Sequence, residues 1–166
     1  PTLAEVLSLC QGKIRVNIEL KSYGHNDRLE ERVAKIVEEH GMQNEIIVMS
    51  LDQAMVARMK SLRPEWTVGL LTAVAAGDLT RLDADFLAVN LKIVNRRFVQ
   101  TAHGRDKQVF AWTVNDPLIM STLIGRGVDN LITDKPALAR SVLRQREEMS
   151  SVERLLVELG GTWSDA

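Results

Sequence analysis

Short apolar runs alternate with longer amphipathic stretches along the chain. The short runs are rich in Val, Ile, Leu and Phe, which favours β-strands. In the stretches between them, apolar residues recur every three or four positions, which predicts helices. The predicted strands are 14–21, 46–50, 67–72, 86–90, 108–114 and 130–134. The predicted helices are 2–10, 27–40, 52–62, 94–103, 116–126 and 136–148, and the segment 73–85 fits either a short helix or a loop.

This alternation predicts a parallel sheet in which helices connect successive strands. The runs 46–50 and 86–90 are almost entirely apolar, which is typical of strands covered on both faces. The architecture is then a (β/α) barrel or an open doubly wound sheet, and no GxGxxG follows a strand to favour dinucleotide binding. Because a complete barrel takes about 250 residues, the first interpretation gives an α/β, TIM-like barrel that is incomplete, with about six β/α units.

Two helix boundaries have a local explanation in the sequence. Gly41 follows the helix predicted for 27–40 and suits the left-handed position beyond a helix end. Asp116 followed by Pro117 is typical of an N-cap and a first helical residue.

The last part of the chain, residues 149–166, has a helical pattern of its own. We expect residues 1–148 to form the barrel portion and 149–166 a helical extension. Ser150 and Glu153 have the spacing of a capping box. An apolar stripe follows, made of Val152, Leu155, Leu156 and Leu159. We expect this helix to pack on its own domain, and a subunit contact is the alternative.

Composition narrows the function classes. The 166 residues suit one domain, and a net charge of −1 without basic clusters gives no support for nucleic-acid binding. No apolar run is long enough to span a bilayer. The single cysteine, Cys10, excludes an intramolecular disulfide and is expected to be buried. The cytoplasm is favoured, and an upstream targeting segment stays open because the chain starts at Pro1 in what looks like a helix start.

The run 14–21 places polar residues inside an otherwise apolar strand. Strand alternation puts Ile14, Val16, Ile18 and Leu20 on one face and Asn17, Glu19 and Lys21 on the other. A carboxylate at the carboxyl end of a barrel strand can bind Ca²⁺ or Mg²⁺, and a neighbouring lysine can hold a phosphate. A structural ion pair between Glu19 and Lys21 is the alternative.

Other predicted strands also end in groups that can form hydrogen bonds, and together these could form the mouth of a site. They are Ser50, Thr72, Asn90, Trp112 with Asn115, and Asp134. Taken singly, Ser50, Thr72 and Asn90 fit turn or cap residues equally well. Trp112 could be core, and Asp134 before Lys135-Pro136 reads as a helix cap.

Six motifs in this order resemble the later part of glycerophosphodiester phosphodiesterases. They are PTLAEVL (1–7), NIELK (17–21), MSLD (49–52), RPEWTVGLL (63–71), VFAWTVND (109–116) and GVDNLITDKP (127–136). The resemblance extends to about residue 140. It implies a TIM-like barrel, a divalent cation (Ca²⁺ or Mg²⁺), and hydrolysis of a small-molecule glycerophosphodiester to glycerol phosphate and an alcohol.

The resemblance also implies roles for single residues. Glu19 matches a metal-binding glutamate of the family, Lys21 matches a lysine near the substrate phosphate, and Trp112 matches a tryptophan that lines the substrate pocket. Asn115 matches the motif without an assigned role.

The family's catalytic histidines lie in H-R-G and H-D motifs, and two more metal carboxylates lie in an E-x-D motif; none of these occurs here. His40 and His103 read as helix-end residues, and His25, after the strand 14–21, is the one histidine placed to face a substrate. No catalytic residue is therefore assigned. We expect the chain alone to bind metal weakly and to hydrolyse little.

Missing strands would leave 14–21 and 130–134 with open edges. We expect a homo-oligomer or an upstream segment to cover them. A non-catalytic truncated barrel that binds a phosphate-bearing ligand or a partner chain is the second hypothesis. A third, a Schiff-base enzyme using Lys21, is disfavoured because Glu19 lies so close in sequence.

Overall fold

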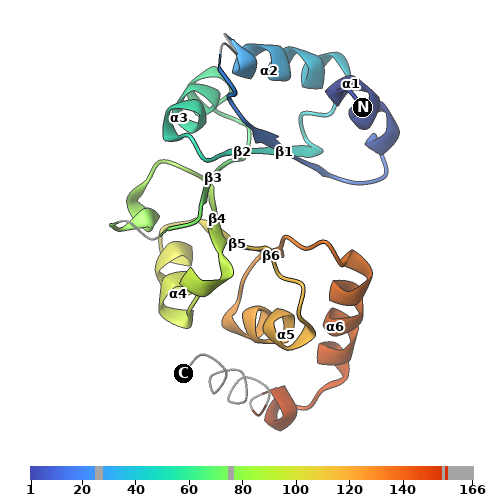
Figure 1. Cartoon of the computed structure of the whole chain (residues 1–166), viewed down its shortest axis with the longest axis vertical. Coiled ribbons are helices and arrows are strands. Elements are labelled where there is room, and N and C mark those ends of the chain that lie inside the picture. Colours follow the sequence, from blue (N-terminus) through green and yellow to red (C-terminus); the bar gives the residue numbers. More distant parts are fainter. Residues whose placement is uncertain (25–27, 75–76, 155, 157–166) are drawn as a thin grey trace. The chain divides into compact units, whose positions relative to one another are not determined.

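Strands and helices alternate along the chain, as the hydrophobic pattern predicts (Figure 1). The structure is a computed structural model, and it describes residues 1–24, 28–74, 77–154 and 156. Its strands are β1 (Val16–Leu20), β2 (Ile46–Ser50), β3 (Val68–Thr72), β4 (Phe86–Asn90), β5 (Gln108–Trp112) and β6 (Asn130–Leu131). Its helices are α1 (Leu3–Cys10), α2 (Leu29–Glu39), α3 (Gln53–Leu62), α4 (Arg96–His103), α5 (Pro117–Arg126) and α6 (Pro136–Glu148), with 3₁₀ turns η1 (Leu79–Arg81) and η2 (Leu91–Ile93).

The order of the strands distinguishes the two architectures. The strands lie in the sheet in chain order from β1 to β6, and the pairs β1–β2, β2–β3 and β5–β6 are parallel. A doubly wound sheet reverses its strand order at a switch point, whereas a (β/α) barrel does not. The α/β, TIM-like prediction with six β/α units is therefore confirmed, and the doubly wound alternative is wrong.

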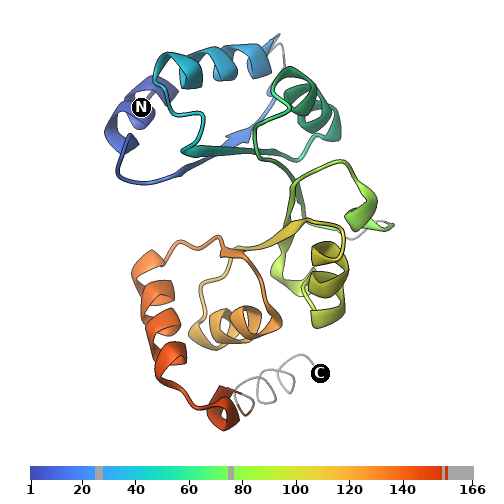
Figure 2. The same cartoon turned by 180° about the vertical axis from the view of Figure 1, so that it is seen from behind.

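The chain forms two compact units, one of residues 1–71 with 82–87 and the other of 72–81 with 88–166. In the first unit, α1, α2 and α3 lie on one side of β1 and β2 (Figures 1 and 2). Leu7, Val37 and Met59 on these helices are fully buried, and so is Val48 on β2. Removing such side chains from water is the main favourable term in folding this unit.

In the second unit, α4 packs against β5, and α5 packs against α6. Val99, Val109 and Met120 are buried in its core. Asp116 caps α5 by accepting hydrogen bonds from the backbone N–H groups of Leu118 and Ile119, as predicted. The fold of this unit thus follows from the same apolar periodicity and cap signals as the sequence shows.

Several local expectations need correction. β1 begins at Val16, and Ile14, which was expected on the apolar face of this strand, precedes it and is 64% exposed. The last strand is short and ends at Leu131. Cys10, at the end of α1, is half-buried instead of buried. The segment 73–85, for which a short helix or a loop was open, is a loop with the short 3₁₀ turn η1 among its described residues.

Beyond α6, the capping box is present: the Ser150 backbone N–H donates to the Glu153 carboxylate over 2.7 Å, and Ser150 Oγ accepts from the Glu153 N–H. Val152 and Leu156 are 67% and 62% exposed, so these two residues do not pack on the domain as expected. Leu155 and Leu159 lie outside the described residues. Across the described part of the chain, no helix combines the length and apolar character needed to cross a membrane.

Candidate functional site

Glu19 and Lys21 form a close pair at the carboxyl end of β1. Glu19 is the penultimate residue of the strand, and Lys21 follows its last residue. The Lys21 Nζ lies 3.2 Å from the Glu19 Oε1, with the side chains 49% and 26% exposed respectively. An ion pair this accessible contributes little to stability, because water screens it. Both groups keep further hydrogen-bonding capacity, since a carboxylate accepts at two oxygens and an ammonium donates three protons.

The strand register identifies what lies beside Glu19. Glu19 pairs with Met49 on β2, and Met49 pairs with Gly69 on β3, so these three positions share one face of the sheet. A Cβ atom on Gly69 would overlap the ring of Phe86, which therefore covers this glycine. Met49 and Phe86 are both buried. Glu19 consequently has apolar neighbours on the adjacent strands and its cationic partner just beyond the end of its own strand.

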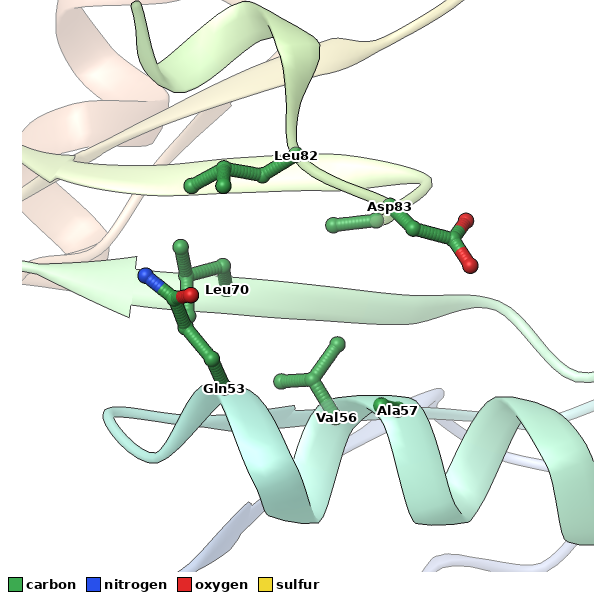
Figure 3. Close-up of a pocket in the computed structure, with 7 residues that line it drawn as sticks. Gln53, Val56, Ala57, Leu70, Leu82 and Asp83 are labelled. Atoms are coloured by element: carbon green, nitrogen blue, oxygen red, sulfur yellow. The ribbon is translucent and has the colours of Figure 1, made fainter. Parts of the chain in front are cut away.

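A small hollow lies on the opposite face of the same strands (Figure 3). It has a volume of about 160 Å³ and is lined by Gln53, Val56 and Ala57 of α3, by Leu70 of β3, and by residues 82–84. Leu70 pairs with Ser50, one position along from the Met49–Gly69 pair, so its side chain points away from the face of Glu19. This hollow is therefore separate from the candidate site.

Three of the residues at strand ends make local hydrogen bonds typical of turns and caps. Ser50 Oγ donates to the Leu20 carbonyl over 2.9 Å and accepts from the Asp52 N–H. Thr72 Oγ1 donates to the Val74 carbonyl. Asn90 Oδ1 accepts from the Lys92 backbone N–H in η2. Their alternative interpretation as structural residues is confirmed.

Trp112, the last residue of β5, is half-buried. Its Nε1 donates to the Ala88 carbonyl over 3.0 Å, which fixes the orientation of the ring. Part of the side chain remains accessible, so Trp112 is not simply core.

A polar network that the sequence did not predict joins the ends of β5 and β6. The Asn115 Nδ2 donates to the Asp134 Oδ2 over 2.8 Å, and the Asn115 Oδ1 accepts from the Thr133 hydroxyl and from the Asp134 N–H, each over 3.0 Å. Contrary to the expectation, Asp134 does not cap α6: its carboxylate accepts from the Asn115 amide, and Lys135 occupies the N-cap position without a side-chain hydrogen bond. The sequence signal for this contact is that Asn115 and Asp134 lie in the motifs VFAWTVND and GVDNLITDKP, near the ends of two predicted strands.

The histidines of the described part have structural partners. The His40 Nδ1 lies 2.7 Å from the Ile36 carbonyl oxygen at the end of α2. The His103 Nε2 lies 2.8 Å from the Asp129 carboxylate. His25 lies outside the described residues.

The described residues do not by themselves complete a metal site. Among them, no three His, Cys, Asp or Glu side chains gather where an ion could be held. Ca²⁺ and Mg²⁺ take about six oxygen ligands or more, and Glu19 supplies at most two. Lys21 is also too exposed and too close to a carboxylate for the desolvated lysine that a Schiff-base mechanism needs.

Comparison with known proteins places this geometry in a family. The model of the glycerophosphoryl diester phosphodiesterase family matches residues 1–138. A glycerophosphodiester phosphodiesterase of Caldanaerobacter subterraneus subsp. tengcongensis is 28% identical over 151 residues, covering 87% of this chain and 62% of that protein. The chain spans 59–62% of the length of three such curated relatives.

Solved structures agree on the fold. A glycerophosphodiester phosphodiesterase from Parabacteroides distasonis superimposes with a TM-score of 0.80 at 24% identity, covering 89% of this chain and 65% of that one. A phosphodiesterase from Oleispira antarctica, solved in complex with its product sn-glycerol-3-phosphate, has a TM-score of 0.75 at 23% identity, over 87% and 61% of the two chains. With a family match over residues 1–138 of 166, the chain belongs to the glycerophosphoryl diester phosphodiesterase family.

Proposed function

We propose that this chain takes part in the hydrolysis of glycerophosphodiesters to glycerol phosphate and an alcohol. The observation that carries the proposal is the Glu19–Lys21 pair, 3.2 Å apart and accessible at the carboxyl end of β1. Active sites of (β/α) barrels are built at this end of the strands. Family membership and the relatives' names support the reaction class.

Lys21 would bind the phosphodiester. Its side chain is half exposed, so the ammonium can exchange Glu19 for a phosphate oxygen without a large desolvation cost. Glu19 would give one carboxylate to a divalent cation, Ca²⁺ or Mg²⁺, which takes further oxygen ligands. Such a cation, when bound, supplies positive charge near the phosphate. In the other compact unit, Trp112 is the residue that the family resemblance assigns to the substrate pocket, and its indole is held by the hydrogen bond to the Ala88 carbonyl.

A second candidate function is binding of a phosphate-bearing ligand without hydrolysis. It is favoured by the single carboxylate at the candidate site within the described part of the chain, where no three metal-ligating side chains gather. Without a complete cation site and an assigned general acid, cleavage would be slow. The two functions differ in turnover but share the requirement for Lys21.

The test is a hydrolysis assay on glycerophosphocholine with Ca²⁺ or Mg²⁺ and an EDTA control, combined with a titration of glycerol 3-phosphate. We expect slow, cation-dependent turnover that Glu19→Gln and Lys21→Met each reduce about a hundredfold or more, the scale reported for removing one group that stabilises charge in a transition state. Binding of glycerol 3-phosphate that needs Lys21, without any turnover, would favour the second candidate.

A matched control is available on α2. Lys35 and Glu39 form an exposed ion pair of 3.7 Å there, away from the strand ends. Lys35→Met and Glu39→Gln remove the same charges and should leave both turnover and binding unchanged. Equal effects of the two pairs of substitutions, or wild-type behaviour of Lys21→Met in both measurements, would contradict both candidate functions.

A further inference from the structure

The turn that leads from β2 into α3 is fixed by the two residues on either side of Leu51. The Ser50 Oγ donates to the Leu20 carbonyl over 2.9 Å and accepts from the Asp52 N–H over 3.1 Å. Asp52 is the N-cap of α3, and its carboxylate accepts from the Ala54 N–H over 2.7 Å. The hydrocarbon side chain of Leu51 takes no part in these bonds, so they do not explain why an apolar residue occupies this position.

Leu51 and Lys21 are neighbours at the carboxyl edge of the sheet. Leu20 and Ser50 are partners in the parallel ladder between β1 and β2, and Lys21 and Leu51 are the residues that directly follow them. The hydrogen bond from the Ser50 Oγ to the Leu20 carbonyl joins the two strand ends at this point. Both residues belong to the first compact unit, so the register of two adjacent strands is sufficient to bring them together.

This edge exposes apolar surface next to the cation. Leu51 is 58% exposed, and Tyr23, two residues beyond Lys21, is 80% exposed. A hydrophobic staple, in which the residue before an N-cap packs on the fourth residue of the helix, would bury Leu51 against Val56. Val56 is buried, whereas more than half of Leu51 stays in contact with water, so a staple accounts for only part of the Leu51 surface. The exposed part lies at the end of the strands where barrel sites are built.

We propose that Leu51 is a specificity-determining residue that contacts an alkyl or acyl chain of a phosphodiester whose phosphate is bound by Lys21. The inference rests on the proposed function, because that function places the phosphate at Lys21. A group joined to this phosphate and lying toward β2 meets Leu51 next. Burial of hydrocarbon against Leu51 is favourable, whereas a leucine side chain offers no hydrogen bond to a hydroxyl group. The site should therefore favour substrates that carry such a chain.

The test compares two probes of equal charge, methyl phosphate and monomeric hexyl phosphate, by calorimetric titration of the full chain. We expect the wild type to bind hexyl phosphate about tenfold more tightly, the scale of burying about two methylene groups. Leu51→Asn should reduce this ratio to about twofold or less, because the apolar contact is lost. Leu51→Met should keep the ratio, and Lys21→Met should weaken binding of both probes. A staple on Val56 alone would change the stability of Leu51→Asn and not the ratio.

The matched control is Ile14→Asn. Ile14 is 64% exposed in the same compact unit and precedes the amino end of β1, so the substitution removes a similar apolar side chain from the opposite end of the strand. It should show the wild-type ratio.

Equal affinity of the wild type for the two probes, an unchanged ratio in Leu51→Asn, or the same loss in Ile14→Asn would each overturn the inference. A wild type that binds neither probe would overturn it together with the role of Lys21. If the predicted ratios are found but no glycerophosphodiester is hydrolysed, the proposed hydrolysis fails and this inference stands. If glycerophosphocholine is hydrolysed but the two probes bind equally, the proposed hydrolysis stands and this inference fails.

Discussion

Gly69 shows how a single missing side chain shapes the face that carries Glu19. Its position beside Met49 is covered by the ring of Phe86, and a Cβ atom would overlap that ring. Phe86 is completely buried and close-packed, so it has no open space to move into. The glycine is therefore required by packing and not by backbone conformation.

We predict that Gly69→Ala lowers the free energy of unfolding by about 1–3 kcal/mol, the usual range for overpacking a core. Urea denaturation would measure the change. Adding Phe86→Leu should recover part of the loss, because it removes the clashing ring atoms. Equal stability of wild type and Gly69→Ala would contradict this packing of Phe86 over the glycine.

At the same scale, the sequence predicts Glu19 and Lys21 but not Asn115 with Asp134. Strand alternation alone puts Glu19 and Lys21 on one face, since both belong to one run. The Asn115–Asp134 contact depends on the register between two strands and on which residue caps α6. The cap expected at Asp134 is absent, and its carboxylate instead contacts Asn115, a residue distant in sequence, which no local pattern reveals.

Among the elements, the turn η1 is held to the loop after α4 by a charged cluster. The Asp78 carboxylate accepts from the Thr80 hydroxyl over 2.6 Å and from the Arg105 Nη1 over 2.9 Å. These hydrogen bonds, that of Thr80 first, hold the pKa of Asp78 well below its usual range. This cluster holds in place a segment that has no apolar periodicity. Because such periodicity is the main sequence signal for a helix or a strand, the sequence did not decide between a short helix and a loop for 73–85.

This lowered pKa predicts a direction of pH dependence. A carboxyl whose pKa is lower in the folded state stabilises the fold above its unfolded pKa of about 3.9. That contribution is lost as the pH falls from there toward the folded pKa. Asp78→Asn should therefore be less stable than the wild type at pH 6, and the difference should shrink below about pH 4.

Urea denaturation of both proteins from pH 6 to the acid limit of folding would measure this difference. Asp106→Asn is the control, since Asp106 is exposed and has no side-chain hydrogen bond among the described residues. A difference between wild type and Asp78→Asn that stays constant across the range would contradict the role of the ionised Asp78.

For the whole molecule, alternating apolar runs were sufficient to predict the α/β class and the six strands. Strand order could not be read from periodicity, because a doubly wound sheet has the same alternation. It follows instead from pairing between strands that are distant in sequence. The ligand set of the candidate metal site cannot be predicted from periodicity either. The residues that would bind a cation together with Glu19 depend on how the chain folds, and not on the sequence of β1.

A calorimetric titration with Ca²⁺ tests most directly whether Glu19 is a cation ligand, as the proposed function requires. We predict weak binding by the wild type and about tenfold weaker binding by Glu19→Gln, because a hard cation needs the carboxylate charge. Lys21→Met should bind Ca²⁺ at least as well as the wild type, because it removes a positive charge 3.2 Å from the ligand. Unchanged Ca²⁺ affinity in Glu19→Gln would contradict the account.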